Sequence, residues 1–385
     1  MALYELIILG SPKPKQVVSI TKAIKEVAKD FELDFPQDIA VLTSTQFADH
    51  ELKACSTALY FGGTITTDSQ IISTLEAEKV PIIPIVQQGD SFGSSIPSSI
   101  SATNAYFVST GDPHLKALAA LSCESLGLLR KQRRVFISYR RMDSREVAVQ
   151  LFDQLSARGF DVFLDTHDIR PGEPFQEVLW HRLVDSDVVI MLDTTNYFAS
   201  KWTKQELGRA LLKRIHILRL VWPNHKASRH LSLSETITLK RRDISADKTL
   251  TDGIVDLVIA RTERLRSRSI ATRHLEINGK LRIEVERMGG TFEGIGLHRS
   301  AALTLPNGLK VQAYPVVGVP SAETLNDIHS KAKTAGKHDT PCLVYDDLGI
   351  RDLWLKHLGW LSSNITCVRS LKVSNASWEL AQWDS

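Results

Sequence analysis

The chain of 385 residues is 43% apolar and 24% charged, and its formal net charge is +3. This length predicts two or three domains, and the composition is typical of a soluble globular protein with a full core. The small net charge excludes a global electrostatic field that would require a nucleic acid or a membrane as partner.

The amino terminus is predicted to be a first strand and not a secretion signal, because Glu5 interrupts its apolar run and no basic residue precedes it. No apolar run approaches the ~20 residues that cross a bilayer. Four scattered cysteines lack the Cys-x-x-Cys spacing of a zinc or redox site: Cys55, Cys123, Cys342 and Cys367. We therefore expect a cytoplasmic protein with buried free thiols and no metal.

Residues 1–128 are predicted to form an N-terminal α/β domain, because strands and helices alternate as in a parallel sheet covered by helices. The predicted strands span residues 4–10, 58–63, 81–86 and 105–108, and the predicted helices span 19–31, 67–79 and 114–129. Residues 56–62 and 78–86 parallel residues 186–192 and 213–221 of the next segment. The domain is therefore either a diverged repeat of its neighbour or another doubly wound domain with chance matches.

Residues 131–268 alternate in the same way, which predicts a doubly wound, flavodoxin-like parallel sheet. Strands are expected at residues 134–139, 161–164, 188–193 and 216–222, and helices at 144–157, 175–184, 203–213 and 250–266. Ligands of such sheets bind beyond the carboxyl ends of the strands. Three of these ends carry polar residues, at 139–141, Asp165 and Asp193, and the helix at 203–213 starts at the same edge.

Residues 270–385 are predicted to form a C-terminal mixed α/β domain. Its β-rich segments at 275–286 and 301–311 are followed by alternating strands and helices. Its glycines lack the spacing of a dinucleotide-binding fingerprint. The basic cluster at 261–273 has the spacing of a solvated helix face and no interleaved aromatic residues, which disfavours nucleic acid as a partner.

Five motifs follow one another in the second segment. They are RVFISYRR at residues 134–141, GFDVFLD at 159–165, IRPG at 169–172, SDVVIMLD at 186–193 and SKWTKQEL at 200–207. In these motifs the segment resembles TIR (Toll/interleukin-1 receptor) domains of the kind common in bacterial immune proteins. TIR domains are either enzymes that destroy NAD or non-catalytic assembly modules, and one glutamate largely separates the two classes. Glu206 stands at its position, whereas Ile71 does so in the N-terminal domain if that domain is a repeat.

The resemblance makes Glu206 the catalytic residue of a reaction that cleaves the nicotinamide–ribose bond of NAD+. The reaction has an oxocarbenium-like transition state, whose positive charge a carboxylate beside the ribose stabilises. Nicotinamide needs no general acid because it is already a good leaving group. Trp202, four residues earlier, would stack on a ring of the dinucleotide. The alternative is structural, because Thr203 and Glu206 have the spacing of a helix capping box in which Trp202 packs onto Leu207.

The resemblance implies further NAD-binding residues at the same edge of the sheet: Tyr139, Arg140, Arg141, Asp165 and Arg170. The two adjacent arginines can donate charge-assisted hydrogen bonds to a pyrophosphate. The alternative is a solvated strand end that pairs with acids such as Asp143. Arg170 belongs to the loop at 165–174, which matches the family's BB loop. In TIR enzymes this loop gates the pocket and packs on a neighbouring subunit.

We expect a TIR-type NAD+ glycohydrolase that takes NAD+ as substrate, uses no cofactor and yields nicotinamide plus ADP-ribose or a cyclic ADP-ribose. The family implies an anti-phage immune effector that is activated when TIR domains self-associate, with flanking domains that sense a trigger protein or a nucleotide ligand. The alternative function is a non-catalytic TIR scaffold that mediates protein–protein assembly. In both cases the C-terminal domain is a candidate binding module for a small nucleotide or a partner protein.

Overall fold

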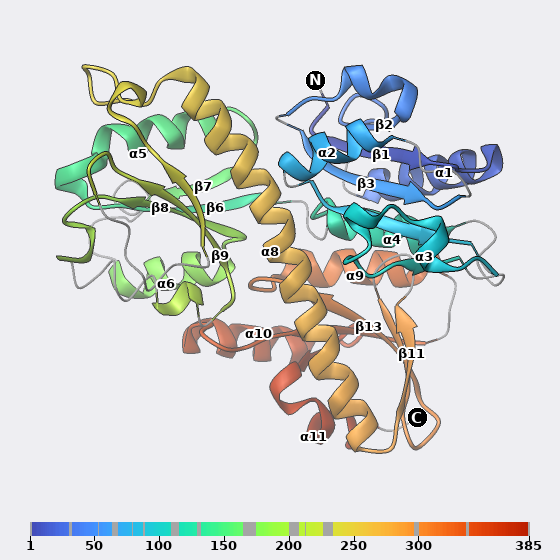
Figure 1. Cartoon of the computed structure of the whole chain (residues 1–385). Coiled ribbons are helices and arrows are strands. Elements are labelled where there is room, and N and C mark those ends of the chain that lie inside the picture. The colour runs from blue at the N-terminus through green and yellow to red at the C-terminus, as the bar shows by residue number, and fades with distance from the viewer. Residues whose placement is uncertain are drawn as a thin grey trace. The chain divides into compact units, whose positions relative to one another are not determined.

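The computed structural model describes most of the chain. The described residues are 2–30, 33–52, 54–63, 68–78, 80–87, 89–108, 115–128, 132–164, 175–199, 208–211, 213–225, 234–295, 300–335 and 339–383. The chain forms two compact units, Met1–Lys131 and Gln132–Ser385. Within the described residues, one five-stranded sheet belongs to the first unit and two belong to the second (Figure 1).

The sheet of the first unit is parallel and has the order β2–β1–β3–β4–β5. Its strands are β1 (Tyr4–Gly10), β2 (Ile39–Thr43), β3 (Cys55–Phe61), β4 (Ile82–Val86) and β5 (Tyr106–Phe107). The helices are α1 (Pro14–Asp30), α2 (Ser69–Ala77), α3 (Phe92–Ser95) and α4 (Lys116–Ser125), with the 3-10 turns η1 (Ser44–Asp49) and η2 (Ser98–Ile100). β1 and β3 are buried along almost their whole length, because the central strands of such a sheet are covered on both faces.

The first sheet of the second unit is also parallel, with the order β10–β9–β8–β6–β7. Its strands are β6 (Arg134–Ser138), β7 (Asp161–Leu164), β8 (Val188–Asp193), β9 (His216–Val221) and β10 (Glu235–Thr238). The accompanying elements are α5 (Arg141–Ser156), α6 (Phe175–Asp185), η3 (Tyr197–Ala199) and η5 (Arg241–Asp243). Counted in chain order, both sheets have the flavodoxin-like order 2-1-3-4-5. The expected fold class is therefore confirmed for both domains.

The matched sequence stretches of the two domains fall on equivalent strands. Residues 56–62 and 186–192 cover β3 and β8, the third strand of each sheet, and residues 78–86 and 213–221 cover β4 and β9, the fourth strand. Since this strand order is shared by many doubly wound domains, it agrees both with a diverged repeat and with an unrelated domain.

The second sheet of this unit is mixed, as expected, and its strands lie in chain order. It consists of β11 (Thr291–Ile295), β12 (Ala301–Thr304), β13 (Lys310–Val316), β14 (Thr340–Tyr345) and β15 (Arg369–Lys372). β11 to β13 pair antiparallel, and β13 to β15 pair parallel. The accompanying elements are α9 (Ala322–Ala335), α10 (Asp352–Asn364), α11 (Ala376–Leu380) and η6 (Val373–Asn375).

The helix α8 (Asp252–Arg287) corrects two expectations. It runs without a break for 36 residues, so the segment at 275–286 is helical and not β, and the domain boundary expected at 268–270 lies inside the helix. α8 packs on β8 and β9 of one sheet and on β11 and β13 of the other (Figure 1). The buried apolar residues Ile270, Ile277 and Leu281 recur at helical spacing.

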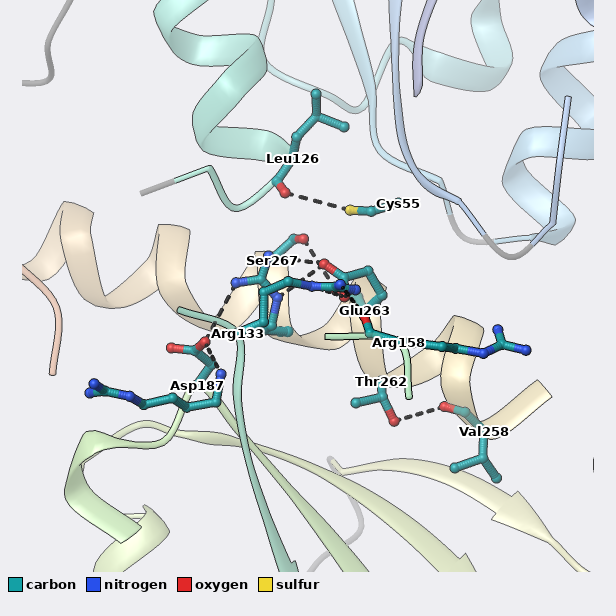
Figure 2. A network of polar contacts seen from close by, with 11 residues as sticks. Cys55, Leu126, Arg133, Arg158, Asp187, Val258, Thr262, Glu263 and Ser267 are labelled. Atoms are coloured by element: carbon teal, nitrogen blue, oxygen red, sulfur yellow. Dashed lines mark hydrogen bonds and ion pairs between the residues drawn. The ribbon is translucent and has the colours of Figure 1, made fainter. Parts of the chain in front are cut away.

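The basic cluster at 261–273 is not a solvated face, because three of its arginines, Arg264, Arg266 and Arg273, are buried. Figure 2 shows Glu263, which lies in the same segment, next to Arg133. The guanidinium of Arg266 has no exposed surface and lies 2.9 Å from Glu263 Oε1 and 3.4 Å from Asp187 Oδ2. Arg133 approaches the other oxygen of Glu263, at 2.6 Å. Burial opposes ionisation of Glu263, but the two arginines outweigh it and lower the pKa of this carboxyl. A buried arginine needs such partners, which the spacing of the cluster did not reveal.

Three of the four cysteines, Cys55, Cys123 and Cys342, are buried free thiols as expected, whereas Cys367 is exposed. It lies in the turn before β15, where no apolar neighbours enclose it. None of the helices within the described ranges has the length and apolar character needed to cross a membrane.

A buried histidine links two acids at the amino-terminal edge of the first unit's sheet. His50 Nδ1 lies 2.5 Å from Glu5 Oε2, and its Nε2 lies 2.9 Å from Glu78 Oε2. Ser56 also donates a hydrogen bond to Glu5. Burial lowers the pKa of His50, but the two carboxylates together outweigh burial and raise this pKa above 6.5. The charged imidazolium therefore contributes to the stability of the first unit.

Raising the pH is expected to destabilise the first unit. A histidine with a raised folded-state pKa contributes stability that is complete below the unfolded pKa of about 6.5 and is lost as the pH rises through the folded value. The thermal midpoint of this unit should therefore fall as the pH rises above about 6.5, and the fall should be absent in His50→Gln. All seven tryptophans follow residue 131. A transition seen by circular dichroism but not by tryptophan fluorescence thus reports the first unit, and an equal slope in the variant would contradict the prediction.

Candidate functional site

The candidate site lies at the carboxyl edge of the first sheet of the second unit. β6 and β8 are neighbours, and Ser138 pairs with Met191 at their ends. The residues that follow β6 therefore lie beside those that follow β8. This brings the 139–141 segment next to Asp193 and Thr194, as the strand assignments predicted.

The three described residues of the predicted NAD site have different environments. The Tyr139 ring belongs to the hydrophobic core beside Val147 and Leu151 of α5, with 5% of its surface exposed. Arg140 is half-buried and Arg141 is exposed at the first turn of α5. Of the three, Arg141 is thus the most accessible to a ligand.

Arg140 forms an ion pair with Asp143, which is the alternative that the sequence left open for it. Arg140 Nη1 lies 3.0 Å from Asp143 Oδ1, and Thr194 Oγ1 donates to Asp143 Oδ2 at 2.9 Å. Asp143 therefore ties the end of β6 to the residue after β8. Ser144 departs from helical geometry at this point, with φ −150° and ψ 28°, so α5 is kinked in its first turn.

A buried ion pair beneath this edge was missed from the sequence. Asp193 has no exposed surface, and its Oδ2 lies 2.5 Å from Arg219 Nη2 and accepts from Arg219 Nε at 2.7 Å. His225 Nε2 lies 3.3 Å from the other carboxylate oxygen. The available signal was an arginine within the apolar strand β9, because a charge in a central strand requires a buried counter-charge.

A second buried contact at the same edge joins the end of β6 to the turn after β8. Ser138 Oγ and the Tyr197 hydroxyl lie 2.6 Å apart, and Tyr197 begins the short turn η3 that follows β8. The two pairs, Ser138–Tyr197 and Asp193–Arg219, fix the ends of β6, β8 and β9 relative to one another. Side-chain contacts therefore join these strand ends in addition to the backbone pairing.

Four predicted site residues lie outside the described residues: Trp202, Glu206, Asp165 and Arg170. The end of the predicted helix at 203–213 is described, and residues 208–211 are helical. Ala210 is fully buried among Phe136, Tyr197 and Ile217. The guanidinium carbon of Arg209 lies 3.3 Å from the centre of the Trp180 ring. This helix end is therefore fixed on the sheet.

The described parts of the chain contain no group of three or more histidine, cysteine or acidic side chains that could hold a metal ion. The chemistry available at the candidate edge is that of arginines, hydroxyl groups and carboxylates.

Of the comparisons with known proteins, one identifies a family and another finds no match. A family model of the TIR domain matches residues 135–251, whereas no curated protein matches the chain. Among solved structures, a putative two-component response regulator/GGDEF domain protein is 11% identical and covers 67% of this chain and 97% of its own, with a TM-score of 0.24.

Two further solved structures are equally distant. The C-terminal domain of glucosamine-fructose-6-phosphate aminotransferase from Francisella tularensis is 10% identical over 71% of this chain and 84% of its own, with a TM-score of 0.19. The transcription regulator CcpA of Lactococcus lactis is 13% identical over 71% and 92%, also with a TM-score of 0.19. Scores this low carry no argument about function. The motifs, the strand order and the family model agree, however, and the chain is a TIR domain protein whose TIR domain covers residues 135–251.

Proposed function

We propose that the chain is a TIR-type NAD+ glycohydrolase that cleaves the nicotinamide–ribose bond and releases nicotinamide with ADP-ribose or a cyclic ADP-ribose. The observation that carries this proposal is the match of the TIR family to residues 135–251, within which Glu206 follows Trp202 at the spacing of the catalytic TIR domains. NAD+ is the substrate in this proposal, and no cofactor takes part.

The carboxyl edge of the sheet supports this proposal. A dinucleotide needs cationic donors for its pyrophosphate, and the exposed Arg141 begins α5 shortly after β6, beside the Arg140–Asp143 pair. The proposed role of Glu206 is to stabilise the positive charge that develops on the ribose, and that of Trp202 is to stack on a ring of the dinucleotide. Asp165 and Arg170 would contact NAD+ from the loop at 165–174.

Activity is proposed to wait on self-association of TIR domains in the cytoplasm. The protein would then serve as an anti-phage immune effector that depletes NAD+ or produces a nucleotide signal. Its flanking domains would receive the trigger, which is a partner protein or a nucleotide.

A non-catalytic scaffold is the second candidate function, and two observations favour it. Arg140 pairs with Asp143 instead of standing free for a ligand, and Thr203 and Glu206 have capping-box spacing. In this case the TIR domain assembles with other TIR domains, and Glu206 only caps a helix.

Nicotinamide release separates the two functions. The purified full chain is incubated with NAD+ at increasing protein concentrations, with and without a crowding agent, and the products are separated by chromatography. An assembly-activated enzyme releases nicotinamide at a rate that rises more steeply than the protein concentration, and the second product identifies a linear or cyclic ADP-ribose. Absence of nicotinamide under every condition would favour the scaffold.

A further inference from the structure

The helix α6 contacts the described end of the helix predicted at 203–213. The guanidinium of Arg209 lies over the Trp180 ring, and 3.3 Å separate its carbon from the ring centre. Burial lowers the pKa of Arg209, so this guanidinium is partly withdrawn from water, where a cation–π contact is stronger. Trp180 itself packs on the hydrophobic cluster that contains Ala210. The helix end is therefore attached to α6 as well as to the sheet.

One residue further along α6, His181 contacts the C-terminal domain, which contains the mixed sheet. Its ring centre lies 5.1 Å from that of Trp354 on α10. Trp354 Nε1 donates to the backbone oxygen of Pro320 at 3.0 Å, and this bond holds the ring on its own domain. Consecutive residues of a helix point about 100° apart, so Trp180 and His181 face different partners. The helix α6 therefore contacts both the described helix end and α10.

The last turn of α6 is part of the core of the C-terminal domain. Val184 belongs to the hydrophobic cluster that contains Tyr314 and Leu343 of the mixed sheet. Asp185 Oδ1 accepts a hydrogen bond from the backbone N–H of Val319 at 2.9 Å, and both Val184 and Asp185 are buried. The C-terminal domain therefore fixes the end of α6, although the helix lies within the TIR domain.

The C-terminal domain also contacts the other end of this segment directly. Lys213 closely follows the described helical residues 208–211. Its Nζ lies 3.4 Å from the backbone oxygen of Asp346 and 3.6 Å from the Oδ2 of the same residue, and Asp346 follows β14 of the mixed sheet. The C-terminal domain therefore supports the described helix end at two points, through α6 at Arg209 and directly at Lys213.

We propose that the C-terminal domain positions Glu206 by supporting the helix that carries it, with the Trp180–Arg209 stack and the His181–Trp354 contact as the connection. This inference rests on the proposed function, since it gives the C-terminal domain a role in NAD+ cleavage. These four residues are positioning residues, which act through the helix and not on NAD+.

The sequence distance between Glu206 and Arg209 makes such support effective. Glu206 precedes Arg209 by three positions, which is about one turn of the predicted helix. A carboxylate stabilises a developing positive charge best when it is held in place before the reaction, and a displacement of about 1 Å is enough to lower a rate by ~100-fold. A small shift of the helix end at Arg209 should therefore reduce turnover.

Steady-state kinetics of nicotinamide release by the full chain test the positioning. Trp180→Leu removes the ring under Arg209 and should lower kcat at least ~10-fold, while the KM for NAD+ should stay within about twofold because the proposed binding residues are unchanged. Trp180→Phe keeps an aromatic face for the guanidinium and should restore most of the rate. A ring needed only for folding would instead reduce the folded fraction, measured by circular dichroism, without changing kcat per folded molecule.

Trp354→Leu tests the connection from the C-terminal domain. It should also lower kcat, because His181 loses the ring that it contacts. The double variant with Trp180→Leu should lose less than the product of the two single losses, since both substitutions act through α6. Trp360→Leu is the matched control, because this tryptophan lies on the same helix α10 and is 61% exposed. It should keep the kcat of the wild type.

Hydrogen–deuterium exchange of the full chain without NAD+ provides a readout that needs no activity. The amides of residues 208–211 should exchange faster in Trp180→Leu and in Trp354→Leu than in the wild type, because the helix end loses support, and Trp360→Leu should not differ from the wild type. Unchanged exchange in a folded Trp354→Leu would overturn the proposal.

The two readouts distinguish a failure of this proposal from a failure of the proposed function. Faster exchange with unchanged kcat in an active enzyme would overturn the proposal, because the C-terminal domain would then support the helix without positioning Glu206. Wild-type protein that releases no nicotinamide would contradict the proposed function, and the exchange result alone would then decide whether the C-terminal domain supports this helix.

Discussion

Glu206→Gln is expected to lower the rate of nicotinamide release at least ~100-fold, which is the loss seen when one preorganised electrostatic group is removed from an active site. The substitution keeps the size of the side chain and removes its charge. It is also the substitution that best separates catalysis from helix capping. Glutamine serves as well as glutamate at the third position of a capping box, so the helix should remain capped.

Two further variants complete this test. Glu146→Gln changes an exposed glutamate of α5 in the same domain and should leave turnover unchanged. Thr203→Ala removes the proposed cap and should cost about 1 kcal/mol of stability with only a small change in the rate at saturating NAD+. Full turnover in Glu206→Gln would remove this residue from the mechanism.

Arg266→Gln is expected to lower the free energy of unfolding of the second unit by about 3–5 kcal/mol, because removing one partner of a buried ion pair leaves buried negative charge with less compensation. Arg266 is fully buried and contacts both Asp187, at the start of β8, and Glu263 on α8. Without the Arg266 guanidinium, the fully buried carboxylate of Asp187 has one cationic neighbour fewer. Chemical denaturation followed by tryptophan fluorescence measures the effect, since all seven tryptophans belong to this unit.

Arg268→Gln on the same helix is the matched control. Arg268 Nη2 lies 2.7 Å from Glu235 Oε2, but 42% of its side chain is exposed, and Arg261 provides Glu235 with another partner at 3.0 Å. Because Arg268 is partly exposed to water and Glu235 keeps Arg261 as a partner, the loss should not exceed ~1 kcal/mol. Equal losses in the two variants would show that burial does not govern the strength of these contacts.

The central strands could be predicted from sequence because burial on both faces demands unbroken apolar runs. β8, with every residue buried, was placed at its observed bounds. The edge strands β2 and β10 were missed for the opposite reason. In β10 only Ile237 is buried, and one apolar residue gives no periodic signal.

The helix predicted at 250–266 is the first part of α8, but its continuation to Arg287 was missed, because the inner face of this helix is partly polar. Arg266, Thr262 and Ser269 are buried there. A hydrophobicity pattern that assigns polar residues to solvent would place this buried face on the surface. The partner of Arg266, Asp187, is 79 positions away in the chain. The carboxyl-edge residues were predictable from strand ends alone, whereas the Asp193–Arg219 pair depends on a strand register that no spacing reveals.

The length of α8 has a practical consequence. Its 36 residues span about 54 Å at 1.5 Å per residue. Both sheets of the second unit pack against this one helix. A TIR fragment truncated at 268 would lose Arg273 and, with it, the ties to the chain at Val184 and Ser186. Shortened versions of the protein should therefore include α8 up to Arg287, because the second half of this helix makes contacts that stabilise the TIR domain.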